Sequence, residues 1–508
     1  MKNKFLIVTT CCLAVLTGCN DFLDKNPDDR ANPDSPSEIS ELLVSAYPST
    51  SYYQFTELMS DNVSDIGNWL AEFYISKSVE EAYWWKEDTE ESIDSPAAYW
   101  NSCYSAIATA NAALDIIDRK PEKVQADYNA QRGEALLCRA YAHYMLVNIF
   151  SKQYDPATYM SAPGIPYVTK PEKVVFATYD RETVKQTYDR IQADLEEGLA
   201  LIDDNSYKVR YYHFTKKAAC AFASRFYQTI CDWDNVIKYA TISLGNDPGE
   251  YIRKWNTDYM HYSNEELQQN YTKYSDRANL MLCAQISRWG RCIGYRYNST
   301  NDIRQSAFML NNPVSGTFGY SFLKASGFDA EFILKFQEHF KKESINASYG
   351  LPYIMAPVFT AEEVILNRAE AYVMGNSDFA SAEKDLCALI SHRLISLSGV
   401  DRLPVTITSL DQNILRNFAR NDKTVFDNFY SGSLSEEQII YLKAILNMRR
   451  KEFFHEGMRW FDIRRFGLEV VHKSKDLKRV ETLSKDDLRK VIQIPKQAIT
   501  LGIPANAR

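Results

Sequence analysis

Beyond its first 18 residues the chain has no apolar run long enough to cross a membrane. A spanning helix needs about 20 consecutive apolar residues, whereas the N-terminal run extends only from Phe5 to Leu16 and two threonines interrupt it. Two lysines precede the run, and small residues follow it. A basic start, a short apolar stretch and a small-residue exit are typical of a secretory signal. We therefore predict a signal peptide over residues 1–18 and an exported mature protein.

Cysteine pairs at metal-binding or redox spacing are also absent. The chain has 10 cysteines but no C-x-x-C, which argues against a zinc or thioredoxin-type site. Cys138, Cys220 and Cys387 fall inside apolar helical patterns, where small buried thiols are common. For Cys283 and Cys292 the sequence leaves open whether they form a disulfide. The many carboxylates leave calcium binding open, although no loop of the D-x-D-x-D-G type supports it, and no metal and no cofactor is predicted.

Several signatures of enzymes are missing as well. There is no G-x-S-x-G, no G-x-x-x-x-G-K and no G-x-G-x-x-G. His455 and Glu456 are adjacent, but Arg459 stands where a zincin would need its second histidine. Glycosidases need only two carboxylates, which any chain with 66 acidic residues can offer. We predict a non-enzyme and keep a glycan-active enzyme as an alternative.

The chain also has no excess of basic residues. Its formal charge is −8 and would become −10 once the two lysines of the signal are removed. Phosphate backbones are bound by basic patches. The charge therefore argues against nucleic acid as a partner.

Amphipathic helical patterns, in contrast, are abundant. In one of them Leu137, Tyr141 and Tyr144 form a stripe beside a second stripe of Leu136 and Ala140, which predicts a helix that packs on more than one side. The clearest of these patterns cover residues 97–118, 132–150, 183–203 and 216–230. We predict an all-α fold.

Two stretches share a helix–turn–helix design. Residues 223–244 and 367–390 each contain a short polar turn with an aromatic residue, Trp233 and Phe379 respectively. Both resemble tetratricopeptide helical hairpins, although they do not follow one another at a fixed period. Residues 246–358 between them are rich in Tyr, Gly and Asn and have no helical period, which predicts a loop-rich insertion that carries binding residues. Residues 400–438 are predicted to be irregular as well.

Three stretches together resemble one known family. They are "LTGCNDFLDKNPDD" around Cys19, the helix "RGEALLCRAYAHYMLVNIF" and the C-terminal "MRRKEFFHEGMRWFDIRRFG". The first is similar to a bacterial lipobox, whose cysteine becomes the lipidated first residue of the mature protein. All three resemble the SusD/RagB family of Bacteroidetes, and "VIQIPKQAI" near the C-terminus resembles the family's closing segment.

The resemblance implies both an architecture and a role. We expect a lipidated tether over residues 19–36 and a single SusD-like domain over 37–508, built on tetratricopeptide-like hairpins. The protein would sit on the outside of the outer membrane, held by its lipid alone. It would capture oligosaccharide without catalysis and deliver it to a SusC-like TonB-dependent transporter. A helical-repeat adhesion or scaffold lipoprotein remains an alternative function.

Candidate glycan contacts come from aromatic residues that fall outside helical stripes. An aromatic face can lie against the C–H groups of a pyranose, and polar side chains can bind its hydroxyls. Members of the family place such sites between an N-terminal stretch and the central insertion. The candidates are Asp61, Asn62, Asp65, Asn68, Trp69, Tyr74, Trp84 and Trp85 in the N-terminal stretch, and Trp289, Arg291, Tyr295, Arg296, Tyr297 and Asn298 in the insertion.

The C-terminal signature, in contrast, is predicted to be structural. Acidic and basic side chains alternate there with aromatic ones, which indicates semi-buried ion pairs that are costly to break. The residues assigned to this role are Glu452, Glu456, Arg459, Trp460 and Asp462.

Lipidation of Cys19 can be tested by replacing its thiol. Two or more lipid chains are needed for stable membrane attachment, at about 0.8 kcal/mol per buried CH₂. We expect the full-length protein to sediment with outer membranes and the Cys19→Ser variant to appear in the soluble fraction, as followed by immunoblotting. A variant that still sediments with membranes would contradict lipid anchoring at this residue.

Overall fold

The computed structural model describes residues 33–67, 77–172, 179–292, 296–325, 329–342, 344, 346–398 and 401–508. The predicted signal peptide, Cys19 and most of the predicted tether lie outside this part. So do four of the candidate glycan contacts, which are Asn68, Trp69, Tyr74 and Tyr295.

Helices are the main regular elements of the described chain, and short antiparallel strands accompany them. The helices are α2 (Pro36–Leu43), α3 (Tyr53–Leu58), α4 (Lys77–Tyr83), α5 (Pro96–Asp118), α6 (Glu122–Gln125), α7 (Asn129–Phe150), α8 (Val184–Leu201), α9 (Lys216–Thr229), α10 (Trp233–Leu244), α11 (Asn264–Tyr271), α12 (Trp289–Cys292), α13 (Asn301–Arg304), α14 (Ala361–Asn376), α15 (Phe379–Ile390), α16 (Gln412–Asn421), α17 (Glu436–Glu452), α18 (Met458–Arg465) and α19 (Lys496–Thr500). The strands are β1 (Ser64–Asp65), β2 (Asn279–Ile286), β3 (Tyr297–Asn298), β4 (Thr317–Phe318), β5 (Leu323–Lys324), β6 (Glu331–Phe332), β7 (His339–Lys341), β8 (Leu351–Thr360), β9 (Leu394–Ser398), β10 (Asp401–Pro404), β11 (Val470–Lys473) and β12 (Val480–Leu483).

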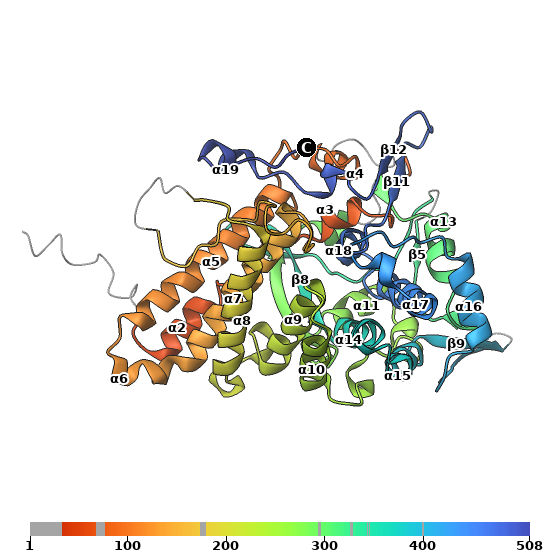
Figure 1. The fold of residues 1–508 in the computed structure, drawn as a ribbon, viewed down its shortest axis with the longest axis horizontal. Helices are drawn as coiled ribbons and strands as arrows, with labels where there is room; N and C mark the ends of the chain where they lie inside the picture. Colours follow the sequence, from red (N-terminus) through yellow and green to blue (C-terminus); the bar gives the residue numbers. More distant parts are fainter. Residues whose placement is uncertain are drawn as a thin grey trace, which may run out of the picture.

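Helices α5, α7 and α8 form one side of the molecule (Figure 1). α7 packs against both neighbours, and its residues from Glu134 to Phe150 are all buried. Two glycines let α7 and α8 approach closely, because a Cβ on Gly198 would lie 3.0 Å from the carbonyl oxygen of Gly133 and 2.8 Å from Leu137 Cγ. The double stripe predicted for this helix is therefore confirmed.

The two predicted helix–turn–helix units are also confirmed. They are the pairs α9–α10 and α14–α15, and although the insertion separates them in sequence, α10 and α9 both pack against α14. Each second helix begins at an aspartate whose side chain accepts a hydrogen bond from a backbone N–H of its first turn, Asp232 in α10 and Asp378 in α15. The relation of these units to tetratricopeptide repeats stays a prediction.

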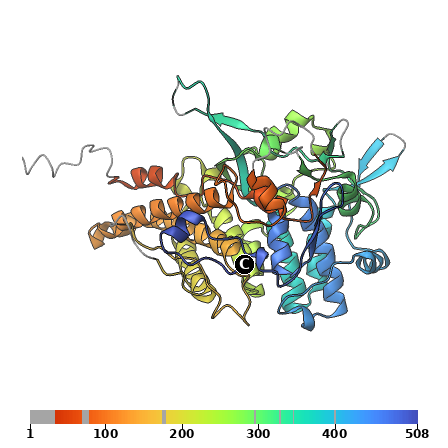
Figure 2. The same ribbon diagram turned by 90° about the horizontal axis from the view of Figure 1, so that it is seen from above.

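The insertion is more ordered than predicted. It contains a three-stranded antiparallel sheet in the order β2–β8–β7, with Ile286 opposite Tyr353 and Asn279 opposite Thr360. The first five residues of strand β2 are all buried, on both faces, so this part of its sequence lacks the alternation that reveals half-buried strands. Cys283 on this strand is a free, buried thiol, and the side chain of Cys292 lies outside the described part. Figure 2 shows the β7–β8 and β9–β10 hairpins projecting from the helical body.

The predicted all-α scaffold is confirmed as a mainly helical body, to which small antiparallel sheets are added. One prediction about an irregular stretch needs correction. The irregular stretch predicted over 400–438 contains α16, which Asp411 caps by accepting hydrogen bonds from the backbone N–H groups of Asn413 and Ile414. Short helices of this kind depend on their cap and on tertiary packing more than on propensity.

Buried ion pairs hold the C-terminal signature in the interior. Arg393 is fully buried and donates two hydrogen bonds of 2.7 Å to the carboxylate of Glu452. It also lies 3.2 Å from Glu362, which pairs with Arg253 at 2.8 Å. We name these four residues the central charge network. Glu362 and Glu452 lie in α14 and α17, Arg393 lies between α15 and β9, and Arg253 lies in the insertion, so the network fixes the relative positions of these segments.

The remaining signature residues are paired in the same way. Lys335 Nζ lies 2.7 Å from Glu456, and Asp462 receives hydrogen bonds of 3.0 Å from both Arg449 and Arg465. Arg459 donates to Asp61 at 2.8 and 2.9 Å, although Asp61 was a candidate glycan contact. Trp460 is fully buried. The structure therefore places all five residues assigned to a structural role inside the core.

A tight turn between α17 and α18 joins this core to α3. Gly457 has a φ of +69°, and a Cβ there would lie 2.0 Å from Thr56 Oγ1. Glu57 of α3 accepts hydrogen bonds from the backbone N–H groups of His455 at 2.9 Å and Gly457 at 3.0 Å. Burial raises the pKa of Glu57 to about 7 despite these bonds. Only glycine fits the turn at this position.

Removal of one charge from the central network should destabilise the fold strongly. In Glu452→Gln the buried Arg393 loses its main counter-charge, and breaking such a pair costs about 3–5 kcal/mol. Urea unfolding followed by circular dichroism measures the difference. The matched control is Glu437→Gln, which removes a partly exposed pair with Arg416 at 2.6 Å and should cost less than about 1 kcal/mol. Equal losses in the two variants would contradict the role of the network.

Candidate functional site

The structure brings the two candidate segments together. β1 pairs antiparallel with β3, with Ser64 opposite Asn298 and Asp65 opposite Tyr297. Arg296 donates two hydrogen bonds of 2.9 Å to the carboxylate of Asp65. Burial alone would raise the pKa of Asp65, but the Arg296 guanidinium outweighs it and holds that pKa below its usual range. This pair acts as a clamp between the N-terminal stretch and the insertion.

A stack of four rings lies against the clamp. The ring centroids of Tyr297 and Tyr83 are 4.3 Å apart, those of Tyr83 and His472 4.1 Å, and those of His472 and Trp85 4.2 Å. All four side chains are buried. We call Tyr297, Tyr83, His472 and Trp85 the ring stack. It ties β3, α4 and β11 to one another through face-to-face contacts.

The ring stack overturns part of the predicted glycan site. Trp85 and Tyr297 are buried in it, and Trp84 is buried with the Arg479 guanidinium 3.8 Å from its ring centroid. Trp289 is buried too, and its Nε1 donates to the carbonyl oxygen of His455 at 2.7 Å. The prediction that these rings offer faces to a sugar is wrong in this structure. They lack a helical stripe because several short segments bury them together, and not because they are exposed.

The polar candidates are mostly engaged as well. Asn62 is fully buried and accepts a hydrogen bond from Arg450 Nε at 2.8 Å, and the buried Asn298 accepts one from the backbone N–H of Ser299. Arg291 pairs with Glu338 at 2.8 Å, yet 41% of its side chain remains exposed. Among the described candidates Arg291 is therefore the most accessible to a ligand.

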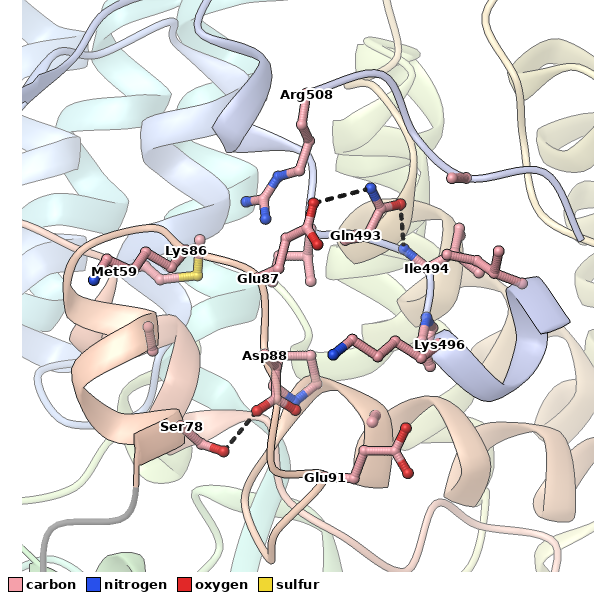
Figure 3. A pocket seen from close by; sticks show the side chains of 17 residues that line it. Met59, Ser78, Lys86, Glu87, Asp88, Glu91, Gln493, Ile494, Lys496 and Arg508 are labelled. Atoms are coloured by element: carbon pink, nitrogen blue, oxygen red, sulfur yellow. Dashed lines mark hydrogen bonds between the residues drawn. The ribbon is translucent and has the colours of Figure 1, made fainter.

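A pocket of about 230 Å³ opens at the Trp85 end of the ring stack (Figure 3). One wall is formed by the residues that follow Trp85 and the other by the C-terminal segment, whose Arg508 donates to the carbonyl oxygen of Trp85 at 3.2 Å. Its lining residues are Met59, Ser78, Ala82, Lys86, Glu87, Asp88, Glu91, Pro96, Ala97, Ile492, Gln493, Ile494, Pro495, Lys496, Ile499, Ala505 and Arg508. We call it the C-terminal pocket.

Hydrogen-bonding groups converge on this pocket above an apolar floor. Ser78 Oγ donates to Asp88 Oδ1 at 2.6 Å, while Asp88 Oδ2 is buried and has no partner among the described residues. Gln493 Nε2 lies 3.5 Å from Glu87 Oε1, and Lys496 extends into the pocket from the opposite wall (Figure 3). Carboxylates, an amide and an ammonium group of this kind can bind the hydroxyls of a small polar ligand.

Sequence reasoning located the segment but not the residues of this pocket. "YWWKED" was selected for its tryptophans, whereas the following Lys86, Glu87 and Asp88 are the ones that line the pocket. The sequence does show three consecutive polar residues directly after Trp84 and Trp85, and this pattern could have indicated the pocket. Gln493 and Lys496 come from a segment about 400 residues away, which no local pattern connects to α4.

The described residues offer neither a metal-binding cluster nor a membrane-spanning helix. They contain no group of three or more His, Cys, Asp or Glu side chains that could hold a metal ion. Among the same residues, no helix has the length and apolar character required to cross a membrane.

Comparisons with known proteins agree with the resemblance seen in the sequence. A family model described as "Starch-binding associating with outer membrane" matches residues 21–228, and the model of the SusD family matches residues 335–500. SusD-like protein P2 of Formosa agariphila is 24% identical over 267 residues, which are 48% of this chain and 47% of that protein. The match therefore spans about half of this relative's length.

Solved structures show the same fold over nearly the whole chain. A SusD superfamily protein of Bacteroides thetaiotaomicron has a TM-score of 0.63 at 17% identity and covers 94% of this chain and 100% of its own. One from Bacteroides fragilis has a TM-score of 0.62 at 19% identity, with 92% and 98% covered. A laminarin binding SusD-like protein has a TM-score of 0.56 at 16% identity, with 93% and 99% covered. The chain belongs to the SusD/RagB family.

Proposed function

We propose that this protein is a non-catalytic, lipid-anchored glycan-binding protein of the outer-membrane surface. It captures an oligosaccharide and passes it to a SusC-like TonB-dependent transporter. Membership of the SusD/RagB family supports the role, and so do the names of relatives that bind starch or laminarin. A tetratricopeptide-like helical body serves as the support of the site.

The juxtaposition of β1 and β3 is the observation that carries the proposal. The Asp65–Arg296 clamp and the ring stack hold an N-terminal segment against the insertion, although more than 200 residues separate the two in sequence. A ligand site assembled from distant segments needs such rigid support. If the segments were flexible, the ligand would have to order them on binding, and this entropy cost would lower the affinity.

The aromatic faces of the site come from residues next to the clamp in sequence. The stacked rings are covered, so we assign sugar stacking to Trp69, Tyr74 and Tyr295, of which Trp69 follows Gly67 by two positions and Tyr295 directly precedes Arg296. Polar contacts come from Arg291 and from the C-terminal pocket, where Asp88 offers a carboxylate oxygen without a described partner.

Binding in this proposal involves no bond-breaking step. Stacking holds the apolar face of the sugar, and carboxylate, amide and guanidinium groups hold its hydroxyls. Energy for uptake then comes from the transporter, and the bound glycan needs only to be released into it. Moderate affinity suits this task, since a ligand that binds too tightly leaves slowly.

Glycan titrations test the assigned contacts. The chain from residue 20 to 508 is titrated calorimetrically with oligosaccharides of starch and laminarin, and we expect at least one to bind. Trp69→Ala and Asp88→Asn should each weaken that binding about tenfold, which corresponds to about 1.4 kcal/mol. Phe429→Ala removes an exposed ring on another part of the surface and should leave affinity unchanged.

A buried ring gives the contrasting control. Trp85→Ala should lower the free energy of unfolding by about 3–5 kcal/mol, measured in urea, without a specific effect on a folded site. Affinity that is unaffected by both Trp69→Ala and Asp88→Asn would contradict the assigned site. Release of new reducing ends from the bound glycan would favour a glycan-active enzyme instead.

The proposed partner can be identified from native membranes. After mild detergent extraction, affinity-tagged full-length protein should co-purify with a large outer-membrane β-barrel, detected by mass spectrometry. The Cys19→Ser form, purified in parallel, controls for contacts made after extraction. Recovery of extracellular or matrix proteins in place of a barrel would favour the adhesion scaffold.

A further inference from the structure

A second, larger pocket lies at the opposite end of β2 from the candidate site. It has a volume of about 530 Å³ and is formed by the α8–α9 connection, the start of α9 and the start of β2. Its lining residues are Asp204, Lys208, Val209, Arg210, Tyr211, Thr215, Lys217, Tyr251, Tyr274, Arg277, Asn279 and Leu280. We call it the tyrosine pocket.

The aromatic rings of this pocket are accessible, unlike those of the ring stack. Tyr274 is 55% exposed and Tyr211 is 38% exposed. Their ring centroids are 5.8 Å apart and their planes are inclined by 56°. Tyr251 forms a further part of the lining, with Lys217 Nζ 3.9 Å and the Arg277 guanidinium 4.8 Å from its ring centroid. The exposed part of each ring can lie against the apolar face of a sugar.

The pocket is also basic within an acidic protein. Four cationic residues line it and Asp204 is the one acidic residue among the lining residues, whereas the whole chain has a formal charge of −8. Asp204 already accepts a hydrogen bond of 2.6 Å from the backbone N–H of Lys216. A local excess of positive charge over a concave surface attracts anions and raises their local concentration.

Two of these cations are available to a ligand. Among the described residues the Lys208 ammonium has no ion-pair or hydrogen-bond partner, and the Arg210 guanidinium donates only to Asn205 Oδ1 at 3.3 Å. Arg277 pairs with Glu250 at 2.9 and 3.1 Å, and that pair is more than half exposed. A guanidinium group can donate two parallel hydrogen bonds to two oxygens of one carboxylate or sulfate. Such charge-assisted hydrogen bonds are stronger than those to neutral hydroxyls.

The tyrosine pocket is separate from the site near the ring stack. Asn279 and Leu280 line it at the first residues of β2, whereas Arg291, which is assigned to the site near the clamp, lies in α12 beyond Ile286, the last residue of the strand. From Asn279 to Ile286 the strand spans roughly 23 Å at about 3.3 Å per residue. A single sugar residue therefore cannot contact both sites.

We infer that the tyrosine pocket is a second saccharide site, selective for sugars that carry carboxylate or sulfate groups. The half-open rings select a sugar face, and Lys208, Arg210 and Arg277 select its negative charge. The inference rests on the proposed function only in taking a saccharide as the ligand. Its residues and its ligand class are different from those assigned near the clamp.

Calorimetry with charged and neutral sugars tests the inference on the chain from residue 20 to 508. The probes are a galacturonic acid hexamer, a sulfated galactan oligosaccharide, an uncharged laminarin hexamer and sodium sulfate. At least one charged oligosaccharide should bind, and Tyr274→Ala and the double variant Lys208→Gln/Arg210→Gln should each weaken that binding tenfold or more. Binding should also weaken severalfold when NaCl is raised from 20 to 200 mM, because exposed charges are screened.

Matched controls keep the result specific. Phe429→Ala and Lys478→Gln remove an exposed ring and an exposed ammonium group elsewhere and should not change the affinity for the charged probe. Thermal unfolding of the pocket variants should match that of the parent chain, since the altered side chains are exposed.

Three results would overturn the inference. They are failure of both charged oligosaccharides to bind, binding that the pocket variants do not weaken, and equally strong binding of sodium sulfate, which would make this a bare anion site. Charged-sugar binding that depends on Tyr274 in a chain that binds no neutral glycan would overturn the site near the clamp and support this one. Loss of neutral binding alone in Trp69→Ala would support both.

Discussion

The charge of Arg393 is the constraint on which the rest of the structure depends. Its guanidinium is fully buried in the connection between α15 and β9, so carboxylates from other segments must lie beside it. Glu452 comes from the end of α17 and Glu362 from the start of α14, and Glu362 in turn holds Arg253 of the insertion. Moving any of these four segments away from the others would leave a buried charge without its partner, which is energetically costly. The helices α14, α15 and α17 accordingly lie together in Figure 1.

The position of the candidate site follows from this core through a short series of contacts. Glu452 ends α17, and the turn after it is fixed by the hydrogen bonds from His455 and Gly457 to Glu57 in α3. β1 follows α3 closely in sequence and carries the Asp65 side of the clamp. The ring stack then joins β3 and α4 to β11. The buried ion pairs, which no ligand contacts, therefore hold the site in place. The residues that contact the ligand do not have to stabilise the fold as well.

Sequence reasoning succeeded where a pattern is local and failed where burial depends on distant segments. The long helices and both hairpins have a period of 3.6 residues that the chain itself displays, and the mixture of charges and rings around Glu452 indicated buried ion pairs. Nothing near Glu452 identifies Arg393 as its partner. β2 escaped prediction because its first five residues are buried on both faces, and Trp85 and Tyr297 were misassigned because the missing helical stripe was taken as a sign of exposure.

What covers a ring decides its role, and composition cannot show this. With 33 tyrosines in the chain, a count of aromatic residues favours sugar binding anywhere. Tyr83 has a ring on each side, at 4.1 and 4.3 Å, so its faces already contribute their stacking energy to the fold. Tyr274 has one inclined neighbour and is more than half exposed. A sugar can gain contact energy only from a face that folding has left open, and this is why accessible tyrosines beside unpaired cations outweigh buried tryptophans in locating a site.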